Sequence, residues 1–143
     1  MPVIHLAASE YKTFAKVYDI LNYDMPYNLW LDIIEEVKGS SASILDIGAG
    51  TGEILKRIRA ERKLGIDNSS AMIEMAQQND PSSEYKLCDM MTMDLNESFD
   101  IVTATADVLN YAPSKTDFQQ VLDNVYKHLN ESGLFIFDVH TEY

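Results

Sequence analysis

A glycine-rich turn stands between an apolar run and a helical pattern in the first half of the chain. Residues 44–47 have the sequence Ile-Leu-Asp-Ile, typical of a buried strand, and residues 48–52 have the sequence Gly-Ala-Gly-Thr-Gly. A turn of this composition lets a ligand approach bare backbone, and the helix start behind it presents unpaired N–H groups. The sequence therefore predicts a cofactor site at this turn. Its predicted backbone contacts are Gly48, Ala49, Gly50 and Gly52.

Two classes of cofactor compete for a turn of this shape. A dinucleotide site uses G-x-G-x-x-G to place its pyrophosphate at a helix N-terminus. Here the third glycine comes one residue early, and Glu53 occupies the position where it is expected. A carboxylate repels a pyrophosphate, whereas S-adenosylmethionine carries no phosphate and has a cationic sulfonium and ammonium group. The acidic turn therefore favours S-adenosylmethionine over NAD.

An acidic residue lies at the end of each of the first two predicted strands. Asp67 follows Gly48 by nineteen positions, about where a carboxylate accepts both ribose hydroxyls in this architecture. The alternative for Asp67 is a cap on the helix that follows it. Asp46 either contacts the cofactor, directly or through water, or braces the glycine turn as a hydrogen-bonded carboxylate. Both carboxylates are predicted cofactor-binding residues.

Short apolar runs alternate with helical periods from residue 43 onward, which is the pattern of βαβ units around a parallel sheet. Two helices precede this region, and right-handed connections place helices on both faces of the sheet. We expect a doubly wound, Rossmann-like α/β fold, with a helical cap over 1–40 and a core over 41–143. The predicted strands are 43–47, 63–66, 84–88, 99–104 and 134–139. The predicted helices are 10–21, 26–37, 53–59, 70–79 and 115–129.

The composition argues against several classes of partner and location. The chain has 143 residues, of which 46% are hydrophobic and 24% charged, as expected for one folded domain. Its net charge of -12 disfavours nucleic acid and anionic membranes, and no apolar run has the length that spans a bilayer. The single cysteine, Cys88, cannot form an internal disulfide, so a cytoplasmic location is expected. His5, His128 and His140 are scattered, and no metal site is predicted.

Two segments, the glycine turn with its strand and the second strand with the helix after it, together resemble motifs of a known superfamily. Residues 44–52 resemble the first motif of class I S-adenosylmethionine-dependent methyltransferases, and residues 64–67 followed by 70–76 resemble the second. The resemblance implies that Asp67 binds the ribose of S-adenosylmethionine. It also implies a strand order of 3-2-1-4-5, which the family normally continues with two more strands. Further implied cofactor contacts are Asn68 and Met72.

The resemblance assigns the remaining parts of the cofactor to later segments. It implies that the adenine end lies against Cys88, Asp89 and Met90. Residues 99–104 resemble the fourth strand of the family, and the loop 105–111 after it faces the methionyl end. The implied contacts in this loop are Thr105 and Ala106.

Aromatic residues near the start of the chain resemble the N-terminal helices of small-molecule methyltransferases. This resemblance implies that Tyr11 and Tyr18 close over the cofactor. Because they lie seven positions apart on one helical face, core packing is the alternative interpretation.

Other reactive side chains have ordinary interpretations beside functional ones. Cys88 is interpreted as a buried small residue, and neither a G-x-S-x-G elbow nor a G-x-x-x-x-G-K-[ST] loop occurs. His140 is either a general base at the ligand-binding edge or an exposed residue near the chain end. Met90, Met91 and Met93 either line the adenine pocket or fill gaps in the core.

The chain ends just after its fifth predicted strand, whereas the family sheet normally has seven. We expect either a fragment of a longer enzyme or a partner that supplies the missing strands. An open edge at the fifth strand invites pairing with another chain, so a homodimer through that edge is also predicted.

The predicted function is methyl transfer from S-adenosylmethionine to a nitrogen or oxygen of a small molecule. The acceptor would attack the sulfonium methyl in line, a reaction for which alignment and exclusion of water suffice. No catalytic residue is therefore assigned. The alternatives are a cofactor-binding module without independent catalysis and an NAD-dependent oxidoreductase.

Overall fold

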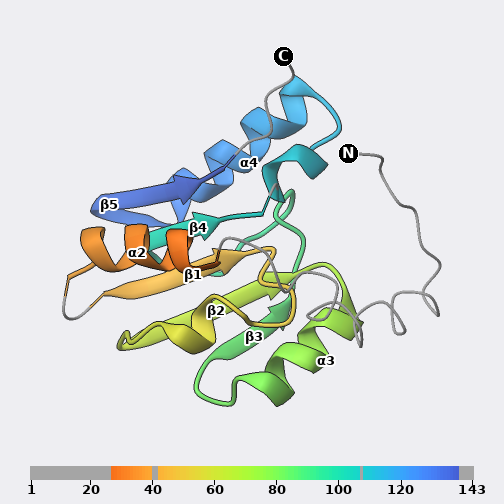
Figure 1. The fold of residues 1–143 in the computed structure, drawn as a ribbon. Helices are drawn as coiled ribbons and strands as arrows, with labels where there is room; N and C mark the ends of the chain where they lie inside the picture. The colour runs from red at the N-terminus through yellow and green to blue at the C-terminus, as the bar shows by residue number, and fades with distance from the viewer. Residues whose placement is uncertain (1–26, 40–41, 107, 139–143) are drawn as a thin grey trace.

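A five-stranded, fully parallel sheet forms the centre of the molecule in the computed structural model, which describes residues 27–39, 42–106 and 108–138 (Figure 1). The strand order is β3-β2-β1-β4-β5, so the chain builds the sheet outward in both directions from β1. This order confirms the predicted doubly wound α/β fold. The strands are β1 (Ser43–Ile47), β2 (Arg62–Asp67), β3 (Glu84–Leu87), β4 (Phe99–Ala104) and β5 (Leu129–Phe137).

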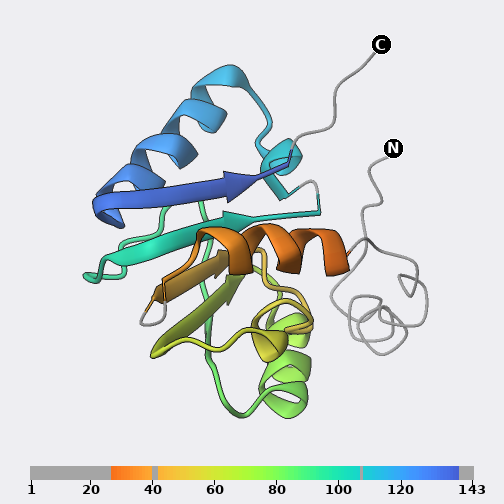
Figure 2. The same ribbon diagram turned by 60° about the vertical axis from the view of Figure 1, so that its left-hand side comes forward.

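Helices cover both faces of the sheet, with α2 and α3 on one side and α4 on the other (Figures 1 and 2). Each face therefore has its own apolar core, as expected for parallel strands that are buried on both sides. The helical elements are α2 (Tyr27–Val37), α3 (Ser70–Asn79), α4 (Lys115–Lys127) and the short 3₁₀ helices η1 (Leu55–Arg57) and η2 (Val108–Tyr111).

The residues of β1 alternate between the two cores because successive side chains of a strand point to opposite faces. Ile44 packs with Trp30 and Ile34 of α2, and both isoleucines are fully buried. Leu45 and Ile47 belong to the other core, together with Val121 and Val125 of α4. The predicted helix 26–37 is thus confirmed and shares a core with the sheet. The predicted helix 10–21 lies outside the described residues.

The predicted helix 53–59 is wrong, because only the three residues of η1 are helical there. Arg62 lies level with Ser43 in the sheet, so residues 53–61 must return the chain along the whole length of β1. Nine residues of α-helix rise about 13.5 Å, whereas a five-residue strand spans about 16 Å. Nine residues in an α-helix would therefore be too short to span β1. The connection instead forms the short 3₁₀ helix η1, which rises more per residue, followed by extended backbone.

The end of α4 also differs from the prediction. The helix begins at a capped end, since the Ser114 hydroxyl accepts the Asp117 N–H at 3.1 Å. The helix ends at Lys127 and not at Leu129, and β5 begins at Leu129, five residues before its predicted start. A register irregularity between β4 and β5, with Ser132 at φ 64°, absorbs these extra residues. Such bulges break the apolar pattern from which strands are predicted.

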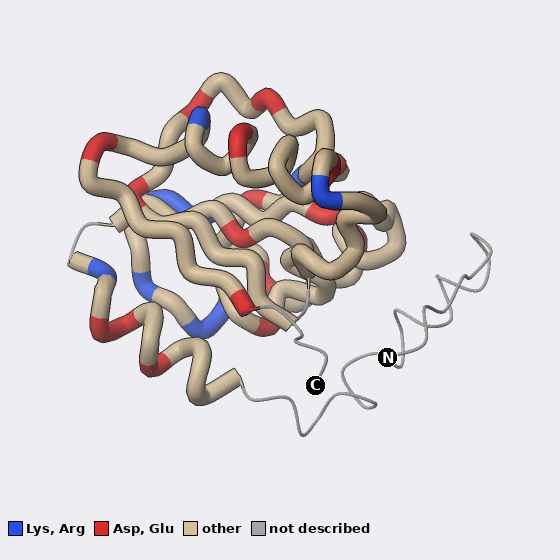
Figure 3. Tube along the Cα trace, turned by 90° about the horizontal axis from the view of Figure 1, so that it is seen from above, with Lys and Arg blue, Asp and Glu red and all other residues tan. Residues whose placement is uncertain are grey.

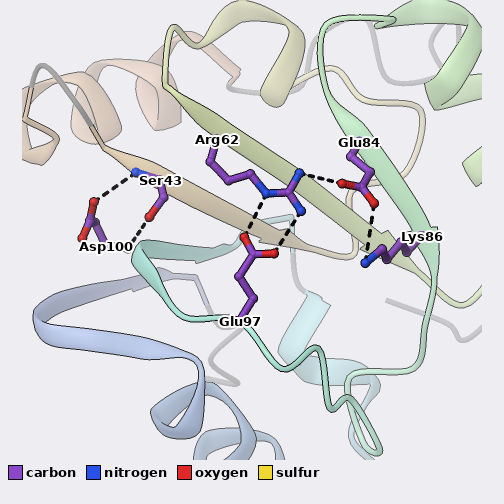
Figure 4. A network of polar contacts seen from close by, with 6 residues as sticks. All are labelled: Ser43, Arg62, Glu84, Lys86, Glu97 and Asp100. Carbon is purple, nitrogen blue, oxygen red and sulfur yellow. Dashed lines mark hydrogen bonds and ion pairs between the residues drawn. The ribbon is translucent and has the colours of Figure 1, made fainter.

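Salt bridges and hydrogen bonds join the amino-terminal ends of the strands, at the end of the sheet opposite the glycine turn (Figure 4). The Arg62 guanidinium binds both oxygens of Glu97, at 2.9 and 3.0 Å, and also Glu84, at 2.6 Å. Ser43 and Asp100 exchange two hydrogen bonds, in which each backbone N–H is bound by the other's side chain. These contacts fix the starts of β1 to β4 relative to one another.

The last strand, β5, is an edge of the described sheet. Leu134 and Phe137 on it are 46% and 45% exposed, while Phe135 packs partly against the α4 side of the core. Pairing of this edge with a second copy of the chain stays a prediction.

Tyr85 of β3 fills the space beside Gly65, which leads to a prediction about stability. A Cβ on Gly65 would lie 2.6 Å from the Tyr85 ring and 2.8 Å from the Ala49 Cβ. Gly65→Ala is therefore expected to lower the free energy of unfolding by roughly 1–3 kcal/mol, the usual cost of overpacking. Urea denaturation measures this, with Gly39→Ala as the control, since none of the described residues beyond its chain neighbours places an atom within 4 Å of that added Cβ. Equal stability of the two variants would contradict the packing described.

Candidate functional site

A pocket of about 460 Å³ lies at the carboxyl ends of β1 and β2, where open parallel sheets bind their ligands. Its walls come from the glycine turn after β1, the start of α3, the segment after β3 and the loop after β4. The volume is in the range of small-molecule sites. The lining residues are Ile47, Gly48, Gly50, Ile66, Asp67, Asn68, Ser69, Met72, Cys88, Asp89, Met90, Met91, Ala106, Val108, Tyr111 and Pro113.

Three glycines of the turn have positive φ angles, which side chains rarely adopt. Gly48, Gly50 and Gly52 have φ values of 67°, 56° and 86°. A Cβ on Gly48 would also collide with the Val108 side chain, and one on Gly52 would lie 2.7 Å from the Tyr85 hydroxyl oxygen. The glycines are therefore required both by backbone conformation and by close packing on the turn.

The Asp67 carboxylate connects the glycine turn to the start of α3. Its Oδ2 accepts the Gly50 N–H at 3.0 Å, and its Oδ1 accepts the Ser69 N–H at 2.9 Å. Ser69 is the residue that caps α3, because its hydroxyl accepts the Met72 N–H. Burial raises the pKa of the Asp67 carboxyl, although hydrogen bonds from Ser69, Gly50 and Asn68 oppose the shift. Asp67 thus lines the pocket and does not serve as the helix cap.

The Asp46 carboxylate lies behind the pocket and not among its lining residues. It is 2% exposed and accepts the Thr103 hydroxyl at 2.7 Å. Burial raises the pKa of Asp46 to about 7, the Thr103 hydrogen bond lowers it in part, and the nearby Asp67 charge adds to the rise. The geometry is that of a carboxylate that braces the strand end before the turn.

Most of the predicted cofactor-binding residues meet at this one pocket. Those that line it are Gly48, Gly50, Asp67, Asn68, Met72, Cys88, Asp89, Met90 and Ala106. Buried residues outside the lining are Asp46, Ala49, Gly52 and Thr105. Tyr11 and Tyr18 lie outside the described residues, as does His140.

Six lining residues were not singled out as cofactor contacts from the sequence, and two of them, Ile47 and Ile66, lie at the ends of β1 and β2. Ser69 sits in a turn whose geometry depends on Asp67, and Val108, Tyr111 and Pro113 belong to the irregular segment after β4. Only the expectation that the loop 105–111 faces the ligand pointed to Val108 and Tyr111. Ala106 in this segment has φ 61°, a left-handed conformation that is uncommon for alanine and is often found at ligand sites.

The segment after β3 supplies the third wall. The Cys88 N–H donates to the Asp67 carbonyl at 2.9 Å, and the Asp89 carboxylate accepts the Met91 N–H at 2.8 Å. Burial and, next, the Asp89 charge raise the pKa of the Cys88 thiol. A thiol that is held protonated is a poor nucleophile, in agreement with the interpretation of Cys88 as a small, unreactive residue. The expectation that Cys88 is buried is wrong, because it is partly exposed in the wall of the pocket.

Glu53 does not act on the pocket in the way its position in the sequence suggested. Its carboxylate is 8% exposed, lies outside the lining, and binds Lys56 at 2.6 Å and Arg57 at 2.8 Å. Two cations therefore neutralise it. Among the described residues that line the pocket, Asp67 and Asp89 are the acidic ones and no lysine or arginine occurs, so repulsion of a phosphate would come from them.

The described part of the chain contains no cluster of three or more side chains that could hold a metal ion. In the same residues, no helix has the length and apolar character needed to cross a membrane. The Asp and Glu positions, which give the chain its net charge of -12, are spread over the described trace in Figure 3.

The fold and the pocket define an α/β protein with a candidate small-molecule site at a glycine turn, and comparison with known proteins identifies its family. Residues 44–133 match the profile of the methyltransferase domain. The chain belongs to this methyltransferase domain family, which confirms the resemblance found in the two motifs and decides against the NAD-dependent oxidoreductases.

Sequence relatives include the protein YqeM of Bacillus subtilis (strain 168), which is 37% identical over 142 residues and matches 93% of this chain and 56% of its own length. A dTDP-4-amino-2,3,4,6-tetradeoxy-D-glucose N,N-dimethyltransferase of Saccharopolyspora spinosa is 33% identical over 98 residues, which cover 67% of this chain and 39% of that enzyme. The chain thus matches about half of the length of the first relative and less than half of the second.

Among solved structures, an S-adenosylmethionine-dependent methyltransferase from Clostridium acetobutylicum ATCC 824 superposes with a TM-score of 0.79 at 28% identity. The match covers 90% of this chain and 57% of that protein. The strand order and the helices on both sides of the sheet are therefore those of a methyltransferase domain.

The raised pKa of Asp46 predicts how stability depends on pH. Between the ordinary aspartate pKa of about 4 and the folded-state pKa of about 7, the folded chain binds more protons than the unfolded chain. The free energy of unfolding should therefore fall as the pH rises through this window. Asp46→Asn should remove this loss and be more stable than the wild type at pH 8, by an amount on the order of a few kcal/mol.

Urea denaturation at pH 5 and pH 8 checks this expectation. The exposed Asp32 on α2 provides the control variant Asp32→Asn, whose difference from the wild type should not change with pH in this way. If Asp46→Asn lost more stability at pH 8 than at pH 5, the carboxylate would be stabilising in its charged form, contrary to the burial described.

Proposed function

We propose that this chain binds S-adenosylmethionine in the pocket at the glycine turn and forms the cofactor-binding part of a methyltransferase that acts on an amine of a small molecule. The observation that carries the proposal is the arrangement of Asp67 and the positive-φ glycines around one pocket at the carboxyl ends of β1 and β2. Family membership and the Clostridium structure support the choice of cofactor.

The pocket chemistry fits the parts of this cofactor. Both Asp67 oxygens accept backbone N–H groups, and the four lone pairs of the carboxylate leave capacity for a ribose hydroxyl. The Asp89 carboxylate can accept the adenine amino group, and the backbone N–H of Met90 is the matching donor for a ring nitrogen. The glycine backbone permits close approach of the methionyl part. Asp67 and Asp89 also give the pocket the charge that favours a cationic ligand.

S-adenosylmethionine supplies an activated methyl group. The chain would therefore contribute by aligning the cofactor with the acceptor and by excluding water. The apolar walls from the buried Met72 and the half-buried Met90 and Val108 are suited to that role. A cationic amine first gives up a proton to water, because an ammonium nitrogen has no lone pair. The neutral nitrogen, aligned with the methyl–sulfur bond, then attacks the methyl carbon while the electron pair of that bond returns to sulfur. No described residue is assigned a part in the proton transfer.

An amine is favoured as the acceptor for two reasons. The Saccharopolyspora relative is named as an N,N-dimethyltransferase of an amino sugar. The net charge of -12 also attracts cationic amines over anionic acceptors in solution. Because the chain matches only part of its relatives, residues that hold the acceptor are left unassigned.

The role of Asp67 can be tested by ligand titration. Asp67→Ala should weaken binding of S-adenosylhomocysteine by roughly 10- to 100-fold, because hydrogen bonds to a charged group contribute about 1.5–3 kcal/mol. Isothermal calorimetry measures the Kd, and urea denaturation confirms that the variant is folded. The exposed Asp123→Asn on α4 is the control and should bind as the wild type does. Equal affinities of Asp67→Ala and the control would remove Asp67 from the site.

The acceptor class can be tested with methyl-labelled S-adenosylmethionine and paired acceptors that differ only in an amino or a hydroxyl group. Incorporation of label into the amino member, and not into its hydroxyl partner, is expected, and mass spectrometry detects it. Transfer to the hydroxyl member alone would contradict the amine proposal. Tight cofactor binding without transfer to either member would favour the alternative of a binding module without independent catalysis.

A further inference from the structure

Two buried polar side chains at the end of α4 face the segment that connects β3 to β4. Asn124 is 5% exposed and lies in the last turn of α4, and His128 follows the helix at 4% exposure. Buried polar groups are retained where they have partners. Each of these two side chains hydrogen-bonds to the connection 88–98, which has no helix or strand of its own.

The Asn124 amide holds the backbone of the pocket wall directly. Its Nδ2 donates to the carbonyl oxygens of Met90 and Met91, both at 3.0 Å. Because carbonyl oxygens only accept, the nitrogen of the amide must face them, and its oxygen accepts Gln120 Nε2 at 2.9 Å. All three of these hydrogen bonds agree on one orientation of the side chain.

His128 holds the same connection four residues further along. Its Nε2 accepts the Leu95 N–H at 3.0 Å, so the ring proton must reside on Nδ1, which donates to the Asn124 carbonyl at 2.6 Å. The Arg62–Glu97 pair then fixes the last part of the connection before β4 (Figure 4). The segment is thus attached to the rest of the fold at three successive places.

Of these three attachments, the one by Asn124 is made at residues that also line the pocket, where the Cys88 N–H already ties the start of the connection to the Asp67 carbonyl. Cys88, Asp89, Met90 and Met91 form the wall after β3, and the Asn124 hydrogen bonds end on two of them. Asn124 itself is absent from the lining. It can therefore affect a ligand only through the placement of this backbone.

We propose that Asn124 is a positioning residue that sets the base selectivity of the pocket by fixing the backbone at Met90 and Met91. The assignment rests on the proposed function, in which the wall after β3 holds the adenine. Adenine offers an amino donor and a ring-nitrogen acceptor, which match the Asp89 carboxylate and the Met90 N–H. Hypoxanthine offers the reverse pattern, so a firmly placed wall rejects it and a loosened wall rejects it less.

The test compares two ligands in each variant. The Kd values of S-adenosylhomocysteine and S-inosylhomocysteine are measured by calorimetry, and their ratio is the readout. A change in the folded fraction cancels in this ratio, because both ligands bind the same folded population. Asn124→Leu, which removes both donors, should lower the preference for adenine at least fivefold. Gln119→Leu is the matched control, since Gln119 is exposed on the same helix and bonds only to Asp123 among the described residues.

A milder variant keeps the test decisive if Asn124→Leu does not fold. Gln120→Leu removes the hydrogen bond that orients the Asn124 amide and leaves Asn124 in place. It should lower the adenine preference in the same direction by a smaller factor. An unchanged ratio in a folded Asn124→Leu, or in Gln120→Leu where Asn124→Leu does not fold, would overturn the proposal.

Hydrogen exchange of the ligand-free protein separates this proposal from the proposed function. The amides of residues 89–95 should exchange faster in Asn124→Leu or Gln120→Leu than in Gln119→Leu, while those of β1 should not change. If the wild type bound neither nucleoside, the proposed function and the base-selectivity role would both fail, and faster exchange would still establish the attachment by Asn124. Unchanged exchange would overturn the positioning role even if the nucleosides bind.

Discussion

The two hydrogen bonds that the Asp67 carboxylate accepts from Gly50 and Ser69 are the interaction on which the pocket depends. Parallel pairing brings the ends of β1 and β2 side by side, and the carboxylate at the end of β2 then joins the glycine turn to the start of α3. The three glycines allow this turn to adopt left-handed backbone conformations. The same carboxylate faces the pocket, so one side chain shapes the site and is available to its ligand.

Contacts at the starts of the strands keep their carboxyl ends, where the pocket lies, in register. Arg62, with Glu84 and Glu97, and the reciprocal pair of Ser43 and Asp100 hold the strand starts together, so their carboxyl ends meet at one level. The helix α4 adds a second kind of support, because its buried polar end holds the connection that runs from the pocket back to β4. Binding surface and scaffold are thus linked through hydrogen bonds as well as through apolar packing.

The sheet and most of the pocket were predictable, because their signals are local or belong to two recognisable motifs. The helix 53–59 was not, since its absence follows from the distance that the chain must cover beside β1. The role of Glu53 was misjudged because Lys56 and Arg57, which neutralise it, are read from sequence as ordinary helix charges. Asn124 could not be found at all, because its partners lie 33 and 34 residues away and only the folded chain brings them together.

The central claim is that this chain holds an S-adenosylmethionine pocket at the glycine turn. Calorimetric titration of the wild-type chain with S-adenosylhomocysteine, and separately with NAD, tests it most directly. We expect saturable one-to-one binding of S-adenosylhomocysteine and no binding of NAD, because the pocket carries carboxylates and no cation for a pyrophosphate among its described lining residues. Binding of NAD alone, or of neither ligand by a chain shown to be folded, would contradict it.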